Sequence, residues 1–84
     1  MRDIDMICVD CSVDTDEIRE FFHVTDAVWE AATATQIVPT FKVLCVGCLE
    51  IRLGRTLRSS DFTDANVNRL GDHSERLRNR LAAP

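Results

Sequence analysis

A small α+β fold built around a bound metal ion is the architecture that this 84-residue sequence predicts, and three observations support it. All four cysteines fall in two Cys-x-x-Cys pairs, Cys8/Cys11 and Cys45/Cys48. Between the pairs lie two short runs rich in aromatic and β-branched residues, which favour strands, and after the second pair begins an amphipathic helical pattern. The order is therefore knuckle, strand, strand, knuckle and helix, where a knuckle is the tight turn between two paired cysteines. This is the order of a treble-clef zinc finger.

The first half of the chain predicts four elements. Residues 6–13 read as an extended entry into the first knuckle, and the acidic run at 14–17 caps a short helical turn. Residues 21–24 are aromatic and β-branched and predict a strand. Thr25 and the acid after it predict the cap of a helix over residues 27–33. The residues expected on the inner face of that helix and at its edge are Val28, Ala31, Ala32 and Trp29.

The second half predicts the partner strand and the main helix. Residues 34–40 form a connector, and residues 41–44 are expected to pair antiparallel with residues 21–24. A helix is expected from Cys48 onwards, with Gly54 inside it at a cost of about 1 kcal/mol relative to alanine and near a neighbouring backbone. The apolar stripe of this helix is Leu49, Leu53 and Leu57.

Beyond this helix the pattern weakens. Phe62 is expected to return to the core, and residues 64–68 read as irregular structure or a short turn. Ser74 precedes a short, exposed C-terminal helix. We therefore expect a zinc-binding domain over residues 1–71 and a helical tail over residues 72–84.

The cysteine spacing carries the chemistry. Two residues between two cysteines let both sulfurs turn toward one point, and Gly47 suits the tight backbone of the second knuckle. Four thiolates at one point are a preferred shell of structural zinc, and a closed shell leaves no position for water or substrate. We expect one structural zinc ion and no catalytic residue. The expected ligands are Cys8, Cys11, Cys45 and Cys48.

Three other interpretations of the cysteines stay open. Disulfides require an oxidising compartment, and a redox-active pair would leave the second matching pair unexplained. A mononuclear iron site of the rubredoxin kind uses the same ligands. Rubredoxins usually carry a glycine after each knuckle, whereas Ser12 and Leu49 stand at those positions.

Charge is unevenly distributed along the chain. The net charge is −4, so the overall electrostatic footprint of a nucleic-acid-binding protein is absent. Residues 1–41 carry nine acids and two bases, and residues 42–84 carry five acids and eight bases. The best candidates for binding a partner, phosphates included, are therefore three arginines at helical spacing, Arg52, Arg55 and Arg58, and beside them Arg76, Arg78 and Arg80. The alternative is an ordinary solvated helix face with internal ion pairs.

The sequence shows neither a secretory signal nor a membrane span. Its start lacks the apolar stretch of a signal peptide, and no apolar run approaches the roughly 20 residues that cross a bilayer. We therefore expect a cytoplasmic protein with no membrane partner.

The two histidines provide a weaker alternative. His23 lies in a predicted strand and His73 in a polar segment, with Asn66 and Asn68 between them. Treble-clef nucleases of the HNH class need a histidine that activates water and side chains that hold a second metal ion. The order of these residues does not match that pattern. A nuclease of this class or a degenerate relative is therefore an alternative and not the main interpretation.

The chain also resembles a group of short bacterial and phage proteins with no assigned activity. The resemblance is carried by Ile-Cys-x-x-Cys near the start, by Val28-Trp29, and by the block LCVGCLEIRLGRTL at residues 44–57 followed by Asp61-Phe62. It covers roughly residues 6–70. It implies a zinc-binding treble clef with the four cysteines as ligands.

These observations predict a non-catalytic interaction module stabilised by zinc. Its partner is a protein or a nucleic acid, and no small-molecule substrate is expected. The alternatives are the HNH-related nuclease and a rubredoxin-like electron carrier, which a red sample would reveal.

Overall fold

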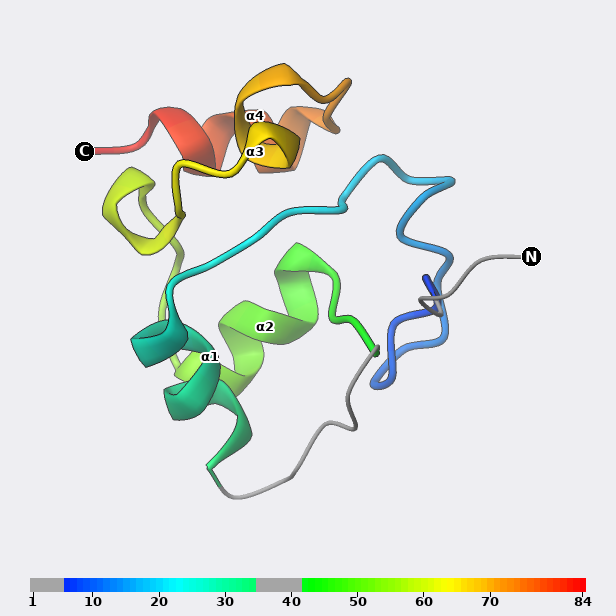
Figure 1. The fold of residues 1–84 in the computed structure, drawn as a ribbon. Coiled ribbons are helices and arrows are strands. Elements are labelled where there is room, and N and C mark those ends of the chain that lie inside the picture. Colours follow the sequence, from blue (N-terminus) through cyan, green and yellow to red (C-terminus); the bar gives the residue numbers. More distant parts are fainter. Residues whose placement is uncertain (1–5, 35–41) are drawn as a thin grey trace.

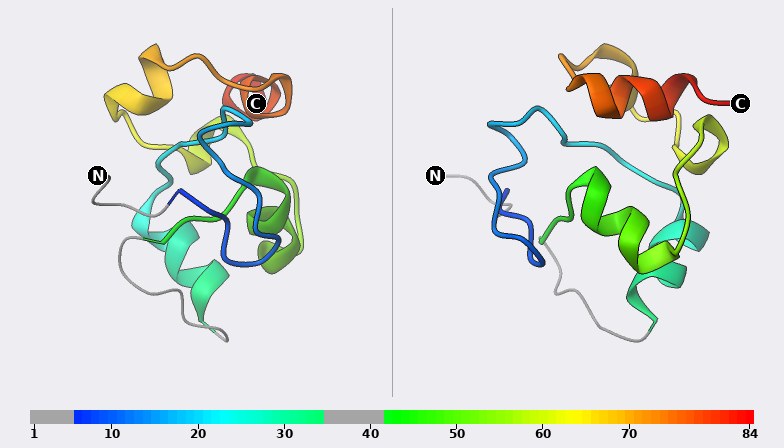
Figure 2. Two further views of the ribbon diagram at one scale, coloured as in Figure 1. Left: turned by 90° about the vertical axis from the view of Figure 1, so that its right-hand side faces the viewer. Right: turned by 180° about the vertical axis from the view of Figure 1, so that it is seen from behind.

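The computed structural model describes residues 6–34 and 42–84, and these residues form four short α-helices and one 3-10 turn without a strand. Helix α2 lies between α1 and α4, and the extended segment leading into α1 passes between α2 and α4 (Figures 1 and 2). Helix α1 packs against α2, and α4 packs against η1. The elements are α1 (Asp26–Thr33), α2 (Val46–Leu53), η1 (Ser59–Asp61), α3 (Asn66–Leu70) and α4 (Glu75–Ala82).

The predicted hairpin between residues 21–24 and 41–44 is absent from the described residues. Val24 instead forms an isolated antiparallel bridge with Phe62, and Val43 forms a parallel bridge with Cys8. The segment before the second knuckle therefore lies beside the first knuckle, where the Val9 N–H donates to the Val43 carbonyl at 3.1 Å. The correction has a physical reason, because the backbone groups that a hairpin would use have other partners. The Val43 carbonyl accepts from Val9, and the N–H and carbonyl of His23 bond to Asn68 and Thr63.

Helix α1 confirms the prediction from its cap. The Thr25 side chain accepts a hydrogen bond from the Val28 N–H, which satisfies one of the free donors at the helix start. Val28 and Ala32 are buried one turn apart, Trp29 is half-buried, and Ala31 is exposed. The inner face is thus narrower than the sequence suggested.

Helix α2 is shorter than predicted, because Gly54 ends it rather than lying inside it. Gly54 has φ of 73°, a left-handed conformation that L residues rarely adopt, and its N–H closes the last turn on Glu50 and Ile51. A Cβ at this glycine would have no neighbour within 4 Å, so the expected close contact is absent and the conformation explains the glycine. Leu57 is nevertheless buried, because the chain turns back after the helix.

The C-terminal part contains more helix than predicted. Residues 64–68, expected to be irregular, include the start of the five-residue helix α3. Helix α4 begins as predicted after Ser74, whose hydroxyl accepts the Leu77 N–H. Leu77 is fully buried, although most of α4 is exposed. The buried apolar core is formed by Cys8, Val24, Val28, Ala32, Leu44, Cys45, Val46, Leu49, Leu57 and Leu77.

Candidate metal centre

The first knuckle is an irregular turn. The Ser12 N–H donates to the Cys8 carbonyl at 2.9 Å, and the Cys8 N–H donates to the Val13 carbonyl at 2.8 Å. Ser12 has φ of 67°, so a left-handed residue follows Cys11 at the position where a glycine would be unstrained. These contacts fold the backbone around its own two cysteines, and they leave Cys8 buried and Cys11 exposed.

The second knuckle is the first turn of α2. Cys45 is the N-cap residue, and its carbonyl accepts the first intrahelical bond from the Leu49 N–H at 3.0 Å. Cys48 follows three residues later, on the same turn. Because the first backbone N–H groups of a helix have no partner within the helix, this position favours negative charge.

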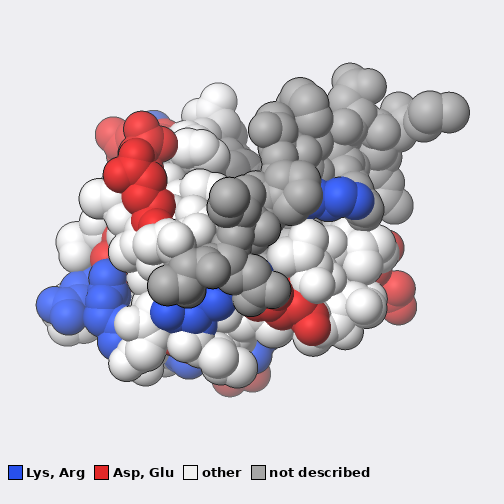
Figure 3. Space-filling model, turned by 90° about the horizontal axis from the view of Figure 1, so that it is seen from below, with Lys and Arg blue, Asp and Glu red and all other residues white. Residues whose placement is uncertain are grey.

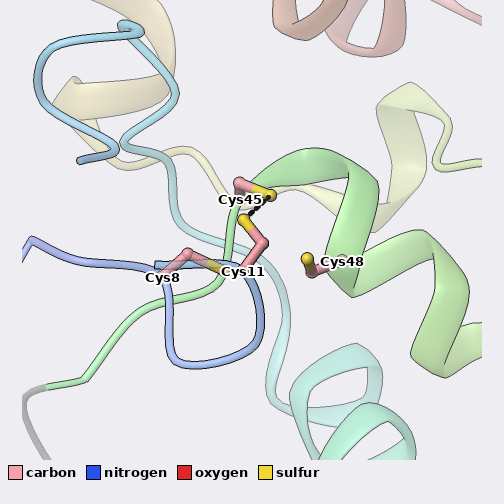
Figure 4. A group of neighbouring side chains, drawn as sticks. All are labelled: Cys8, Cys11, Cys45 and Cys48. Carbon is pink, nitrogen blue, oxygen red and sulfur yellow. Dashed lines mark hydrogen bonds between the residues drawn. The ribbon is translucent and has the colours of Figure 1, made fainter. Parts of the chain in front are cut away.

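The four sulfurs converge on one point (Figure 4). The Sγ atoms of Cys8, Cys11, Cys45 and Cys48 all lie within 4.8 Å of one another, and the Sγ atoms of Cys11 and Cys45 are 3.7 Å apart. A tetrahedral shell with zinc–sulfur bonds of about 2.3 Å places neighbouring sulfurs about 3.8 Å apart. The four thiols therefore lie close together and could bind a metal ion.

No disulfide joins the cysteines, and all four are free thiols. The distance of 3.7 Å between the sulfurs of Cys11 and Cys45 is far longer than the roughly 2.05 Å of a disulfide bond. The disulfide interpretation is therefore not supported by this arrangement.

The thiols differ in their acidity. Burial acts to raise the pKa of Cys8, but backbone hydrogen bonds, the largest from Cys45, outweigh it and bring the pKa down to about 7. Burial raises the pKa of both Cys45 and Cys48, and contact with the neighbouring thiols raises that of Cys48 further. Four adjacent sulfurs cannot all ionise without a compensating positive charge, and a divalent cation at their centre would supply it.

A partly buried ion pair lies beside the second knuckle, and sequence reasoning missed it. The Glu20 side chain is 4% exposed and accepts two hydrogen bonds from Arg76, at 2.9 and 2.7 Å. It also accepts from the Ser74 hydroxyl and from the Val46 N–H, the first backbone donor of α2. Burial acts to raise the pKa of Glu20, but these hydrogen bonds lower it below its ordinary value. An anion therefore caps α2 next to Cys45.

Gly47 lies directly beneath this ion pair. A Cβ at Gly47 would lie 2.7 Å from Nη1 of Arg76, so the guanidinium covers the middle of the second knuckle. The sequence predicted that Gly47 serves the tight backbone, but its φ is not left-handed. The glycine instead makes room for an arginine from α4.

Two of the three arginines at helical spacing predicted to bind a partner form internal ion pairs. Arg52 binds Asp10 of the first knuckle through Nε and Nη2, both at 2.7 Å, and donates to the Ala32 carbonyl at 3.3 Å. Arg55 binds Asp61 in the same two-pronged way, at 2.7 and 3.0 Å.

These pairs alter the acidity of their members. Hydrogen bonding to Arg52 lowers the pKa of Asp10, and hydrogen bonding to Arg55 lowers that of Asp61. Arg58 is exposed. The three arginines therefore do not form one uniform basic row, and their role in partner binding stays a prediction.

The surface mixes the two signs of charge. On the face shown in Figure 3, Lys and Arg side chains and Asp and Glu side chains occur side by side with uncharged residues between them. The described residues on that face therefore show no continuous basic stripe of the kind that nucleic-acid-binding domains commonly present.

The histidines and Asn68 hold backbone segments together. Nε2 of His73 lies 2.7 Å from the Val67 carbonyl, and Nδ1 of His23 lies 2.9 Å from the Thr63 hydroxyl. Asn68 is buried and bonds both the N–H and the carbonyl of His23. Among the described residues, the four cysteines are the one group of His, Cys, Asp or Glu that could hold a metal ion. The nuclease alternative stays a prediction.

Comparison of the chain with protein-family models, curated proteins and solved structures finds no match. The resemblance to short bacterial and phage proteins therefore stays a prediction. Within the part of the chain that the structure describes, no helix has the length and apolarity needed to cross a bilayer.

Proposed function

We propose that Cys8, Cys11, Cys45 and Cys48 bind one structural zinc ion. The observation that carries the proposal is the convergence of four free thiols from two segments 34 residues apart, with sulfur spacing close to that of a tetrahedral shell. Thiolates are soft ligands that select zinc or iron, and four of them leave no open coordination position. The ion would therefore hold the fold together rather than act on a substrate.

We propose further that the zinc site is of treble-clef type. One ligand pair comes from a loop and the other from the first turn of α2, as in that class of zinc finger. The hairpin that usually joins them is absent from the described residues, in which Cys8 and Val24 form isolated bridges with Val43 and Phe62. A bound metal ion would add stability to the fold, because chains of this length bury only a modest fraction of their surface and have a small core.

At the level of activity, the protein would be a non-catalytic interaction module with a protein partner. A closed metal shell argues against chemistry at the cysteines. The net charge of −4 and the internal pairing of Arg52 and Arg55 disfavour the phosphate backbone of a nucleic acid as the main partner.

Metal analysis of protein purified under reducing conditions tests the metal. We expect about one zinc per chain, a colourless sample, and loss of the zinc in Cys48→Ser but not in the surface control Ser60→Ala. One iron per chain with visible absorbance would replace zinc by a rubredoxin-like centre. Metal-free wild type would overturn the proposal.

A gel-shift assay at low salt tests the partner class. We expect no shift of DNA or RNA by the zinc-loaded protein. A shift that disappears with added salt and in the double variant Arg55→Glu/Arg58→Glu would replace the protein partner by a nucleic acid.

A further inference from the structure

Arg76 of α4 reaches across the molecule to the second knuckle. Its Nη1 atom lies over Gly47, one of the two residues between Cys45 and Cys48 on the chain, at the distance where a Cβ would clash. Ser74 and Leu77 fix the start of α4, the first by capping the helix and the second by full burial. The fixed start of α4 thus positions the guanidinium of Arg76 at the second knuckle.

Glu20 sets the orientation of this guanidinium. Its carboxylate accepts from Nε and Nη2 of Arg76, the two-pronged geometry that fixes the plane of an arginine. The same carboxylate accepts the Val46 N–H at 3.1 Å, which ties the pair to the start of α2. Nη1 is the nitrogen that Glu20 does not use, and it is the one that faces the knuckle.

The negative charge of a four-thiolate site would be stabilised by a hydrogen-bond donor at the position of Nη1. A divalent ion bound by four thiolates keeps an excess negative charge, and hydrogen-bond donors and cations around it stabilise that charge. Hydrogen bonding to Glu20 is the largest cause that raises the pKa of Arg76, and the nearby Cys45 raises it further. The position of Nη1 over Gly47 and the effect of Cys45 on the pKa of Arg76 therefore both indicate that the guanidinium lies close to the second knuckle.

We propose that Arg76 is a positioning residue of the metal centre, held by Glu20 so that Nη1 donates to the Cys45 thiolate and couples α4 to the ion. The inference rests on the proposed zinc site. It makes the C-terminal helix, which lies outside the region of sequence resemblance, a part of the centre's surroundings.

A second ion pair made by the same helix, α4, provides the control. Arg80, one turn after Arg76 on α4, binds Glu50 of α2 through Nε and Nη2 at 2.7 and 3.2 Å. No cysteine is among the groups that shift the pKa of Arg80. The two pairs thus share the helix of the arginine and the two-pronged geometry, and they differ in their contact with the knuckle.

The test compares the double variants Glu20→Gln/Arg76→Gln and Glu50→Gln/Arg80→Gln, each of which replaces an ion pair by neutral amides. Cobalt(II) is titrated into reduced protein, and zinc affinity follows from competition with a chromophoric chelator. We expect the first variant to lose about 10- to 100-fold in zinc affinity, the range seen when outer-shell partners of metal ligands are removed. The control should stay within about threefold of wild type, because its pair contacts no ligand.

The spectrum separates a role at the sulfur from a purely structural one. Loss of a hydrogen bond to a thiolate makes that sulfur a better electron donor, so its charge-transfer band to cobalt should move to longer wavelength in the Arg76 variant alone. Equal loss of affinity in both double variants, or an unmoved band, would overturn the inference.

A single variant covers the case in which the double variant does not fold. Arg76→Lys keeps the charge and a bond to Glu20, but one ammonium cannot also reach the knuckle. We expect a weaker effect in the same direction, and a wild-type spectrum with wild-type affinity would overturn the inference. Failure of the wild type itself to bind metal would instead overturn the proposed zinc site.

Discussion

The two knuckles share one sequence spacing but differ in how the chain builds them. The first is a loop held by its own backbone bonds, and it requires a left-handed Ser12. The second is the opening turn of a helix, where regular φ and ψ values place both sulfurs without strain. A Cys-x-x-Cys motif therefore specifies convergence of sulfurs and leaves the backbone that achieves it to the local sequence.

Their surroundings differ as well. The first knuckle is tied to the protein by Asp10, whose side chain is 26% exposed and pairs with Arg52 of α2. The second is covered by Glu20, whose side chain is 4% exposed and has four hydrogen bonds. The carboxylate at the second knuckle is therefore more deeply buried and has more hydrogen bonds than the carboxylate at the first.

Removal of the metal should have the largest effect. Structural zinc sites contribute an apparent binding free energy on the order of 10–16 kcal/mol, which matches or exceeds the stability of a typical small domain. Excess chelator should therefore abolish most of the helical far-ultraviolet circular dichroism, and zinc should restore it. A fully helical metal-free protein would show that the two knuckles are held together without the ion.

Loss of Glu20 should rank second. Glu20→Ala removes the acceptor of several buried or half-buried donors, and we expect a loss of about 2–4 kcal/mol, below the full cost of a buried pair because Arg76 is half-exposed. Asp10→Ala, the matched change at the first knuckle, should cost about 1 kcal/mol, because the Asp10 side chain is 26% exposed and Arg52 keeps its bond to the Ala32 carbonyl. Urea unfolding of the zinc-loaded proteins measures both, and equal losses would contradict the contrast between the knuckles.

Local signals explain what could be predicted from the sequence. Cysteine spacing predicted the cluster, because two residues between cysteines constrain only a single turn of chain. Thr25 and Ser74 predicted the starts of α1 and α4, because a cap needs a side chain and a backbone N–H three residues apart.

Pairings between distant segments account for what was missed. Glu20 and Arg76 are 56 residues apart, and nothing near either one indicates that they meet. The bridge between Val43 and Cys8 replaced the predicted hairpin for the same reason. Gly54 was misread because Leu57 continues the helical spacing by coincidence, although a glycine at the end of an apolar stripe is also a helix-stop signal.

The release of protons on zinc binding should reflect the different acidities of the thiols in the two knuckles. Cys45 and Cys48 have raised pKa values and are therefore protonated at pH 7, whereas the pKa of Cys8 is about 7 and its thiol is partly ionised there. A bound thiolate must lose its proton, so zinc uptake at pH 7 should release at least about two protons, mainly from the second knuckle, and affinity should rise with pH. Calorimetry in buffers of different ionisation enthalpy counts these protons. Release of fewer than one would contradict this order of acidities.

The smallest expected effect concerns Ser12. Glycine adopts a φ of 67° without the steric cost that serine bears, so Ser12→Gly should stabilise the zinc-loaded protein by about 0.5–1 kcal/mol after the entropy of the more flexible unfolded chain is deducted. Ser60→Gly is the control, because Ser60 is equally exposed and its φ is not left-handed, and it should be neutral or slightly destabilising. Urea unfolding compares the two. Destabilisation by Ser12→Gly would mean that the Ser12 side chain stabilises the first knuckle. Its contacts would then outweigh the steric cost of the left-handed backbone at this residue.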